Sequence, residues 1–242
     1  MGTHERRQRE IAERERRFLD TAQLLIVEDG LLNLQMSKIA ARCEYAVGTL
    51  YLHFESKEDL LLALVTRQVQ EHVELFERVA TWKAPTRMRM LAIGVADMIF
   101  VRRNPLYFRV AQYSLCEVVW DAASAARREA FLKATRPMGA VVSDIVTKAI
   151  ADGELARPEM NADELSTGLW SICMGFQKMV HAQGVLEDFE VPQPYQVMCG
   201  HIQHWLNGLG WKPISSGSNP AAEERLIQQI CDEVFDEAAF SV

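Results

Sequence analysis

Residues 46–60 are Ala46-Val-Gly-Thr-Leu-Tyr-Leu-His-Phe-Glu-Ser-Lys-Glu-Asp-Leu60, and this stretch decides the fold of the N-terminal part. It contains a short helix led by small residues from Val47, then aromatic side chains, then a new helix start at Ser56. Just upstream, residues 36–43 place their apolar side chains on one face of another short helix. Two short helices joined by a tight turn predict a helix-turn-helix, whose second helix can lie in the major groove of DNA.

Several short motifs make this match closer than that of a generic helix-turn-helix. They are Gly48-Thr49-Leu50-Tyr51, His53-Phe54, Ser56-Lys57-Glu58 with Leu60, and, upstream, Glu28-Asp29-Gly30 and Ile39-Ala40. Together they resemble the N-terminal signature of the tetracycline-repressor (TetR) family over residues 8–65. The resemblance implies an all-α fold, in which an N-terminal three-helix helix-turn-helix domain precedes a larger helical domain for ligand binding and dimerisation.

The resemblance also implies which residues meet DNA. Gly48 would let the backbone approach closely, Val47 would contact a thymine methyl group, and Thr49 would bond a base edge. Tyr51 and His53 would contact phosphates through their polar tips. The residues expected to bind DNA are Gln35, Val47, Gly48, Thr49, Tyr51, His53 and Lys57.

Packing offers an alternative for some of these positions. Tyr51 can instead be a core residue with a satisfied hydroxyl group, whereas Leu50 and Phe54 are expected in the core in either case. Lys57 would add a positive charge at the start of the helix that follows the recognition helix. Gln35 can bond a phosphate at the start of the helix 36–43, which precedes the recognition helix.

Three positions depart from the family pattern. Glu44 stands where a glycine is common in the turn, and a left-handed backbone there costs a non-glycine residue about 1 kcal/mol. Ala46 stands where a serine or threonine usually caps the recognition helix, and such a cap is worth about 1 kcal/mol. Leu34 replaces a residue that can bond phosphate. These departures predict weaker or different contact with the DNA backbone and no change of fold.

The overall charge does not by itself predict a nucleic-acid binder. The 242 residues include 33 acidic and 26 basic side chains, which give a formal net charge of −7. Attraction to phosphates must therefore come from local placement, and the arginine-rich segment 6–17 is the candidate source. The same segment can be a solvated helix face held by ion pairs one turn apart, namely Glu10 with Arg14 and Glu13 with Arg17. Both interpretations stay open.

Other classes of protein receive little support. Five scattered cysteines without C-x-x-C spacing argue against a disulfide framework and for a reducing cytoplasm. A charged N-terminus and the lack of a long apolar run predict neither a signal peptide nor a membrane span. Motifs of hydrolases and nucleotide-binding loops are missing, so we expect no enzyme. His201 and His204 lack a further ligand nearby, so we expect no metal and no cofactor.

Helical spacing of apolar residues extends over almost the whole chain. The expected helices are 9–28, 36–43, a short helix from 47, 56–79, 85–103, 137–151, 162–182, 191–208 and a C-terminal helix after residue 220. Residues 212–220 form a linker by composition. The C-terminal helix has an apolar stripe that should be buried on its own body or on a second subunit. The stripe consists of Leu226, Ile227, Ile230, Cys231, Val234, Phe235 and Ala238.

The helices 162–182 and 191–208 match the pair that forms a four-helix dimer bundle in proteins that this chain resembles. Gly168 and Gly175 on the first of them would permit close approach of a neighbouring helix. An intramolecular core is the alternative use of these apolar faces. The residues expected at the dimer interface are Leu169, Ile172, Phe176, Ile202 and Trp205.

Aromatic and methionine side chains gather in the middle of the chain and suggest an apolar ligand site. Core packing is the alternative for each of them. The residues expected to contact the ligand are Met98, Tyr107, Phe108, Tyr113, Trp120, Trp170 and Met174.

We therefore expect a helix-turn-helix DNA-binding domain at 1–56, a helical ligand-binding and dimerisation domain at 57–211, and a linker with an amphipathic helix at 212–242. The resemblance implies a cytoplasmic, homodimeric transcriptional regulator that represses by binding a palindromic double-stranded DNA operator and leaves it when a small apolar ligand binds. One alternative is a helical dimer that acts through a protein partner held by the C-terminal helix 221–242; the acidic charge, Glu44, Ala46 and this extra helix motivate it. The other alternative is a helical enzyme that uses a central cavity.

Overall fold

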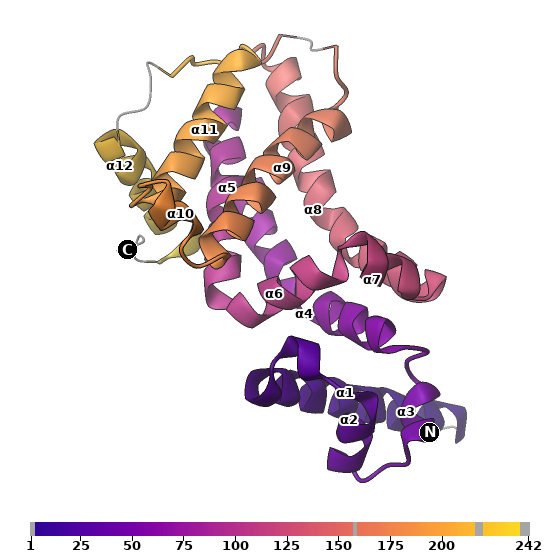
Figure 1. The fold of residues 1–242 in the computed structure, drawn as a ribbon. Coiled ribbons are helices and arrows are strands. Elements are labelled where there is room, and N and C mark those ends of the chain that lie inside the picture. Colours follow the sequence, from indigo (N-terminus) through magenta and orange to yellow (C-terminus); the bar gives the residue numbers. More distant parts are fainter. Residues whose placement is uncertain (1–2, 157–158, 216–219, 238–242) are drawn as a thin grey trace. The chain divides into compact units, whose positions relative to one another are not determined.

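The computed structural model describes residues 3–156, 159–215 and 220–237, and all regular elements in these ranges are helices (Figure 1). The all-α fold expected from the sequence is confirmed. Within the same ranges, no helix is both long enough and apolar enough to cross a bilayer. The elements are α1 (Thr3–Asp29), a 3₁₀ turn (Leu31–Asn33), α2 (Met36–Arg42), α3 (Val47–Tyr51), α4 (Lys57–Thr81), α5 (Thr86–Arg103), α6 (Pro105–Ser114), α7 (Glu117–Ala122), α8 (Ala125–Ala151), α9 (Ala162–His181), α10 (Val185–Asp188), α11 (Pro194–Gly208), α12 (Pro220–Ile230) and a π-helical turn (Cys231–Phe235).

The chain forms two compact units, each assembled from separate segments. The first unit contains residues 1–69 and 105–134, and the second contains residues 70–104 and 135–242. The helix-turn-helix thus shares its unit with α6, α7 and the start of α8. The expected domain boundaries after residues 56 and 211 stay a prediction.

Helix α1 supplies the core of the first unit through one apolar stripe. Phe18, Ala22 and Ile26 recur at four-residue spacing, and each is at most 4% exposed. Ile39 of α2 and Leu50 of α3 are fully buried as well. Helix α1 begins at Thr3 and not near Arg9 as expected, because the arginine and glutamate residues of its first turns are strong helix formers even when they are exposed.

Helix α8 begins at Ala125, so the expected start at Pro137 is wrong. Ser124 caps the helix, since its hydroxyl accepts a hydrogen bond of 3.4 Å from the N–H of Arg127. The alanine-rich stretch that follows has high helix propensity. Pro137 lies inside the helix, where it removes one backbone donor without ending the element.

The second unit is built around α5, which packs against α9, α11 and α12 (Figure 1). Arg87 near the start of α5 is 4% exposed, and its Nη2 donates to Gln203 Oε1 at 2.6 Å. Its Nη1 donates to the Trp211 carbonyl at 2.6 Å, so the buried cation is well satisfied. Tyr195, near the start of α11, lies within the field of Arg102 near the end of α5. Helices α5 and α11 therefore run antiparallel.

The C-terminal helix is buried on the body of its own chain. Ile227, Ile230, Cys231 and Phe235 are each at most 4% exposed, and α12 packs on α5 and α11. The expectation that this stripe is buried is confirmed for these four residues, whereas its last member, Ala238, lies outside the described residues. Since these four residues are covered by the body of their own chain, they are not available to a partner.

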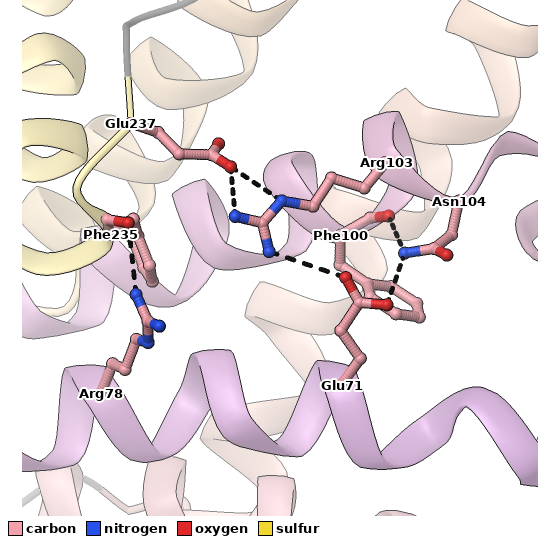
Figure 2. A network of polar contacts seen from close by, with 7 residues as sticks. All are labelled: Glu71, Arg78, Phe100, Arg103, Asn104, Phe235 and Glu237. Atoms are coloured by element: carbon pink, nitrogen blue, oxygen red, sulfur yellow. Dashed lines mark hydrogen bonds and ion pairs between the residues drawn. The ribbon is translucent and has the colours of Figure 1, made fainter.

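Polar contacts also hold this C-terminal segment in the second unit (Figure 2). The side chain of Arg78 donates to the Phe235 carbonyl at 3.2 Å. Arg103 Nε donates to Glu237 at 2.7 Å, and its Nη1 lies 3.6 Å from Glu71 Oε1. These contacts join the end of the C-terminal helical segment to α4 and to the last turn of α5.

Candidate nucleic-acid interface

The turn between α2 and α3 is closed by backbone hydrogen bonds. The N–H of Tyr45 donates to the Ala40 carbonyl at 2.9 Å, and the N–H of Glu44 donates to the Ala41 carbonyl at 3.1 Å. This pair of bonds defines a Schellman motif at the end of α2. Glu44 adopts φ 61° at the position where glycine is preferred. The left-handed backbone expected at Glu44 is therefore present.

Helix α3 begins without a side-chain cap. Ala46 has the extended backbone of an N-cap residue, with φ −64° and ψ 142°, but its methyl group cannot accept a hydrogen bond. The missing cap was expected from the sequence. The amides of the first turn are thus left without a side-chain acceptor.

The buried and exposed faces of α3 are clearly separated. Leu50 and Phe54 are fully buried, as expected. Val47 is 43% exposed and Tyr51 is 48% exposed. The alternative that Tyr51 is a core residue is therefore wrong. Gly48 lies between them with no atom within 4 Å of a Cβ placed on it, so its backbone is open to a close approach. Val47, Gly48 and Tyr51 form the outward face of α3.

The other expected contact residues occupy different environments. Thr49 is half-buried, whereas Gln35 is exposed at the N-cap of α2, with its side chain making no cap bond. Lys57 is the first residue of α4, and its Nζ lies 3.4 Å from the carbonyl oxygen of Leu32 in the 3₁₀ turn. Leu34 is 3% exposed, so this departure from the family pattern is a core residue.

His53 differs from the expectation. Its side chain is only 6% exposed, and its ring packs edge-on against Phe18 with centroids 5.4 Å apart. Burial lowers the pKa of His53; the nearby carboxylate of Glu15 raises it, and Arg14 and Arg127 lower it. The sequence predicted a phosphate contact for His53, but its ring is enclosed by other residues of the first unit and does not face outward.

The arginines of segment 6–17 are used in two ways. The expected pairs of Arg14 and Arg17 with glutamates one turn earlier are replaced by contacts with Tyr45, whose ring centroid lies 5.3 Å and 5.7 Å from the two guanidinium carbons. Arg17 also donates to the Cys43 carbonyl at 3.4 Å. These two arginines therefore support the turn of the motif.

The remaining arginines of α1 lie on its exposed face. Arg6 pairs with Glu10 at 3.0 Å, and Arg16 lies 3.8 Å from Glu13. Such exposed pairs contribute about 0–1 kcal/mol, so their arginines can exchange a carboxylate for a phosphate at small cost.

Arg127 of α8 anchors the end of α3, and no pattern in the sequence pointed to this contact. Arg127 Nη2 donates to the His53 carbonyl at 2.8 Å, and Nη1 donates to Glu15 Oε1 at 3.0 Å. The guanidinium carbon also lies 5.0 Å from the ring centroid of Phe54. Arg127 thus fixes the chain directly after the recognition helix.

A second contact anchors the start of α4. The Ser56 hydroxyl accepts from the N–H of Asp59 at 3.0 Å, which confirms the expected cap. The Asp59 carboxylate is 2% exposed and accepts from the N–H of Glu55 at 3.1 Å and from that of Ser124 at 2.6 Å. Ser124 ahead of an alanine-rich stretch was a readable helix-start signal. Its pairing with a residue 65 positions away has no local signature.

The residues expected at the dimer interface divide into two groups. Leu169 is 2% exposed and Ile202 is fully buried, so the intramolecular alternative holds for both. Trp205 packs on Gly168, where a Cβ would lie 2.9 Å from the indole. Phe176, one to two turns after Gly168 in α9, contacts His201, which precedes Trp205 in α11; the two ring centroids are 5.4 Å apart. Helices α9 and α11 therefore run antiparallel. Ile172, Phe176 and Trp205 are half-buried.

The residues expected to contact a ligand are not gathered in one unit. Tyr107, Phe108, Tyr113 and Trp120 belong to the first unit, whereas Met98, Trp170 and Met174 belong to the second. Met98 is fully buried, but Trp170 is 60% exposed, which is not the position of a residue enclosed around a ligand. The ligand-contact set as a whole stays a prediction.

The helices α1 to α3, the closed turn between α2 and α3 and the outward face of α3 are those of a helix-turn-helix domain. Residues 18–64 match the family described as "Bacterial regulatory proteins, tetR family". The chain therefore carries the N-terminal domain of the tetR family, and the resemblance inferred from the sequence is confirmed.

Similar proteins agree with this assignment. The fatty acid metabolism regulator protein of Bacillus subtilis is 33% identical over 76 residues, which are 31% of this chain and 39% of that protein. The HTH-type transcriptional repressor KstR of Mycolicibacterium smegmatis is 25% identical over 65% of this chain and 73% of its own length. A solved tetR-family regulatory protein from Rhodococcus shares the fold, with a TM-score of 0.60, 16% identity, and coverage of 81% of this chain and 97% of that one. Together these findings support a DNA-binding regulator.

Proposed function

We propose that the protein is a homodimeric transcriptional repressor that binds a palindromic operator and is released from it by a small apolar ligand. The outward face of α3 carries this proposal. Val47, Gly48 and Tyr51 are exposed there, while Leu50 and Phe54 fix the helix from beneath. Small and apolar groups suit contact with base edges, and a tyrosine hydroxyl suits a phosphate.

The names of similar proteins support both halves of the proposal. One relative is named a transcriptional repressor, which favours repression over activation. Another is named a fatty acid metabolism regulator, which favours an effector with a large apolar part. The apolar interior of the second unit, built from α5, α9 and α11, is the environment that such an effector requires.

An exposed tryptophan supports the dimer. Trp170 on α9 is 60% exposed, and Val197 on α11 is 37% exposed. Exposed aromatic side chains are over-represented at protein interfaces, where they supply most of the binding energy. We place the outer faces of α9 and α11 against those of a second copy about a two-fold axis.

The two α3 helices of such a dimer would bind half-sites about one turn of DNA apart, on the order of 10 bp or a multiple. A ligand can release the operator only if it binds better to the arrangement of heads that does not fit DNA. The coupling free energy equals the difference between the ligand's binding free energies for the two arrangements.

Variants in the helix-turn-helix test the proposed interface. Replacement of Tyr51 by Phe should weaken binding to all sequences alike, because a phosphate bond carries no sequence information. Lys57→Met should also lower the slope of log affinity against log salt by about one unit. Thr49→Ala should instead reduce the preference for the operator over other DNA.

The matched control for Lys57 is Lys148→Met, since Lys148 pairs with Asp152 on the exposed face of α8. This variant should bind as the wild type does. If neither Tyr51→Phe nor Lys57→Met changes affinity or salt slope in electrophoretic titrations, the placement of the interface is wrong.

The alternative of a helical dimer acting through a protein partner loses one of its motives. The C-terminal helix was the surface expected to hold that partner. Its apolar residues Ile227, Ile230 and Phe235 are covered by the second unit of the same chain.

A further inference from the structure

Gln177 of α9 is a buried amide that nothing in the described chain satisfies. Its side chain is fully buried, and neither Oε1 nor Nε2 has a hydrogen-bond partner. Buried polar groups are almost always partnered, because an orphaned amide loses its bonds to water without replacement. A leucine or methionine would fill the same space without this loss. Gln177 therefore requires an explanation beyond packing.

Further polar groups lie near Gln177. One turn earlier on α9, Cys173 lies against α5, where a Cβ placed on Gly94 would be 3.8 Å from its Sγ. Burial raises the pKa of the Cys173 thiol, and the carboxylate of Asp97 raises it further. Since α5 and α9 both run antiparallel to α11, they run parallel to each other. Gln177 thus lies level with the turn of α5 that begins at Asp97.

Asp97 is shared by side chains from two more helices. His72 of α4 has its Nε2 3.4 Å from Asp97 Oδ1, and its ring stacks on Phe100 with centroids 4.1 Å apart. Burial raises the pKa of Tyr195 of α11; Arg102 lowers it, and Asp97 raises it again. Four helices of the second unit therefore bring polar groups to one level of an apolar bundle.

We infer that Gln177, Asp97, His72 and Tyr195 form the polar end of a ligand site whose ligand is an apolar molecule with a neutral head group, a hydroxyl or a carboxamide. A glutamine amide offers one acceptor and two donors, so it pairs with a group that both donates and accepts. Arg102 and Asp97 bring opposite charges to Tyr195, so the site supplies no uncompensated charge and favours a neutral head group in a medium of low dielectric. This inference rests on the proposed function, since it specifies the class of the releasing ligand.

The stability of the ligand-free protein gives the first test. Gln177→Met removes the unpaired amide at nearly constant volume, so the melting temperature should rise by about 2–6 °C. The matched control is Gln203→Met, because Gln203 is also buried but accepts from Arg87 at 2.6 Å. That variant removes the bonds that Arg87 Nε and Nη2 make to the Gln203 side-chain oxygen, and it leaves the buried Nε without an acceptor, so its melting temperature should fall.

An unchanged or lower melting temperature for Gln177→Met would overturn the inference. It would show that the amide is already satisfied in the free protein, by an enclosed water or by neighbouring groups. This test uses no DNA, so it is independent of whether the protein binds an operator.

Ligand binding gives the second test. The probes are decanol and decanamide against decanoate and decane, and the corresponding alcohol, amide and acid of cyclohexane and of a sterol skeleton. Thermal shifts of the wild type should favour the neutral head groups on at least one skeleton, and Gln177→Met should lose that stabilisation. Equal shifts in both proteins, a preference for the acids, or no shift with any probe would overturn the assignment of the head group.

Operator binding separates the two proposals. A wild type that binds no DNA but responds to neutral head groups would contradict the proposed function and leave the ligand site in place. A wild type that binds its operator but fails both tests above would contradict the ligand site alone.

Discussion

Glu44 is the residue at which the helix-turn-helix departs most from its own geometric requirements. It holds φ 61° at the end of α2 and presents a carboxylate in the turn of a DNA-binding motif. The Schellman bonds of the turn fix this conformation, so the side chain cannot relieve the strain by a local change. The motif therefore tolerates one unfavourable backbone and one charge that repels phosphate.

Replacing Glu44 by Gly should raise the melting temperature by about 2–4 °C, because glycine adopts φ > 0 without a Cβ penalty. The affinity for DNA should rise as well, since a negative charge near phosphates is removed. Both are measured on the same preparation, by calorimetry and by titration with DNA.

Glu44→Gln separates the two effects of that change. It removes the charge but keeps the backbone strain, so it should raise the affinity without raising the melting temperature. A melting temperature of Glu44→Gly no higher than that of Glu44→Gln would contradict the strain assigned to this position.

Single residues show what a local sequence can and cannot predict. The left-handed turn at Glu44 and the uncapped start at Ala46 follow from the resemblance to the family pattern, and the burial of Leu50 follows from the local spacing of apolar residues. The ring of His53 was expected at the DNA but is enclosed by Phe18 and Glu15 of α1. Its environment depends on residues more than 30 positions away, and no local pattern reveals it.

At the scale of elements, the recognition helix is positioned by α8. Helix α3 has five residues, too few to be stable without tertiary contacts. Arg127 bonds the carbonyl of His53 directly after α3, and Ser124 bonds the buried carboxylate of Asp59. The orientation of α3 therefore depends on the first turn of α8.

Arg127→Ala should weaken operator binding by about tenfold, which corresponds to about 1.4 kcal/mol for one lost charge-assisted anchor. The salt slope should stay unchanged, because Arg127 positions α3 and does not touch phosphate. Fluorescence anisotropy at several salt concentrations measures both quantities.

Arg128→Ala is the matched control for Arg127, because Arg128 bonds the Trp120 carbonyl of α7 and not the helix-turn-helix. It should bind DNA as the wild type does. A slope reduced by about one unit in Arg127→Ala would instead make Arg127 a direct phosphate contact.

The elements themselves were predictable to different degrees. Helices α2, α4 and α5 have clear apolar faces, and Ser56 and Pro85 are start signals for α4 and α5. The expected and observed bounds of these helices agree within about two residues. The start of α8 was missed because Pro137 is the commoner signal for a first turn. The correct signal is Ser124, a cap residue ahead of an alanine-rich stretch, and it did not enter the expectation.

At the scale of the whole molecule, apolar stripes are ambiguous about their partner. The sequence predicted that α9, α11 and the C-terminal helix each bury one face, and they do. It could not distinguish burial within the chain from burial against a second copy, since both require the same periodicity. Leu169 and Ile202 are buried within the chain, whereas the exposed Trp170 suits burial against a second copy.

Trp170→Glu should therefore dissociate the dimer. An interface tryptophan is commonly worth 2 kcal/mol or more, so the dimer should weaken by about thirtyfold or more. Phe189→Glu is the matched control, because Phe189 is 71% exposed beside α10 and lies outside the proposed interface. Sedimentation velocity should show a concentration-dependent shift to monomer in the first variant alone, and equal behaviour of the two would place the interface elsewhere.

Sequence-specific binding to DNA is tested by a salt series of fluorescence anisotropy with the purified protein. One duplex carries the DNA upstream of its own gene, and the other carries the same bases scrambled. We expect tight binding to the first duplex only, with an affinity that falls steeply as salt rises, because α3 and its flanking residues release counterions from phosphates. Flat and identical curves for both duplexes, from a folded dimer, would contradict it.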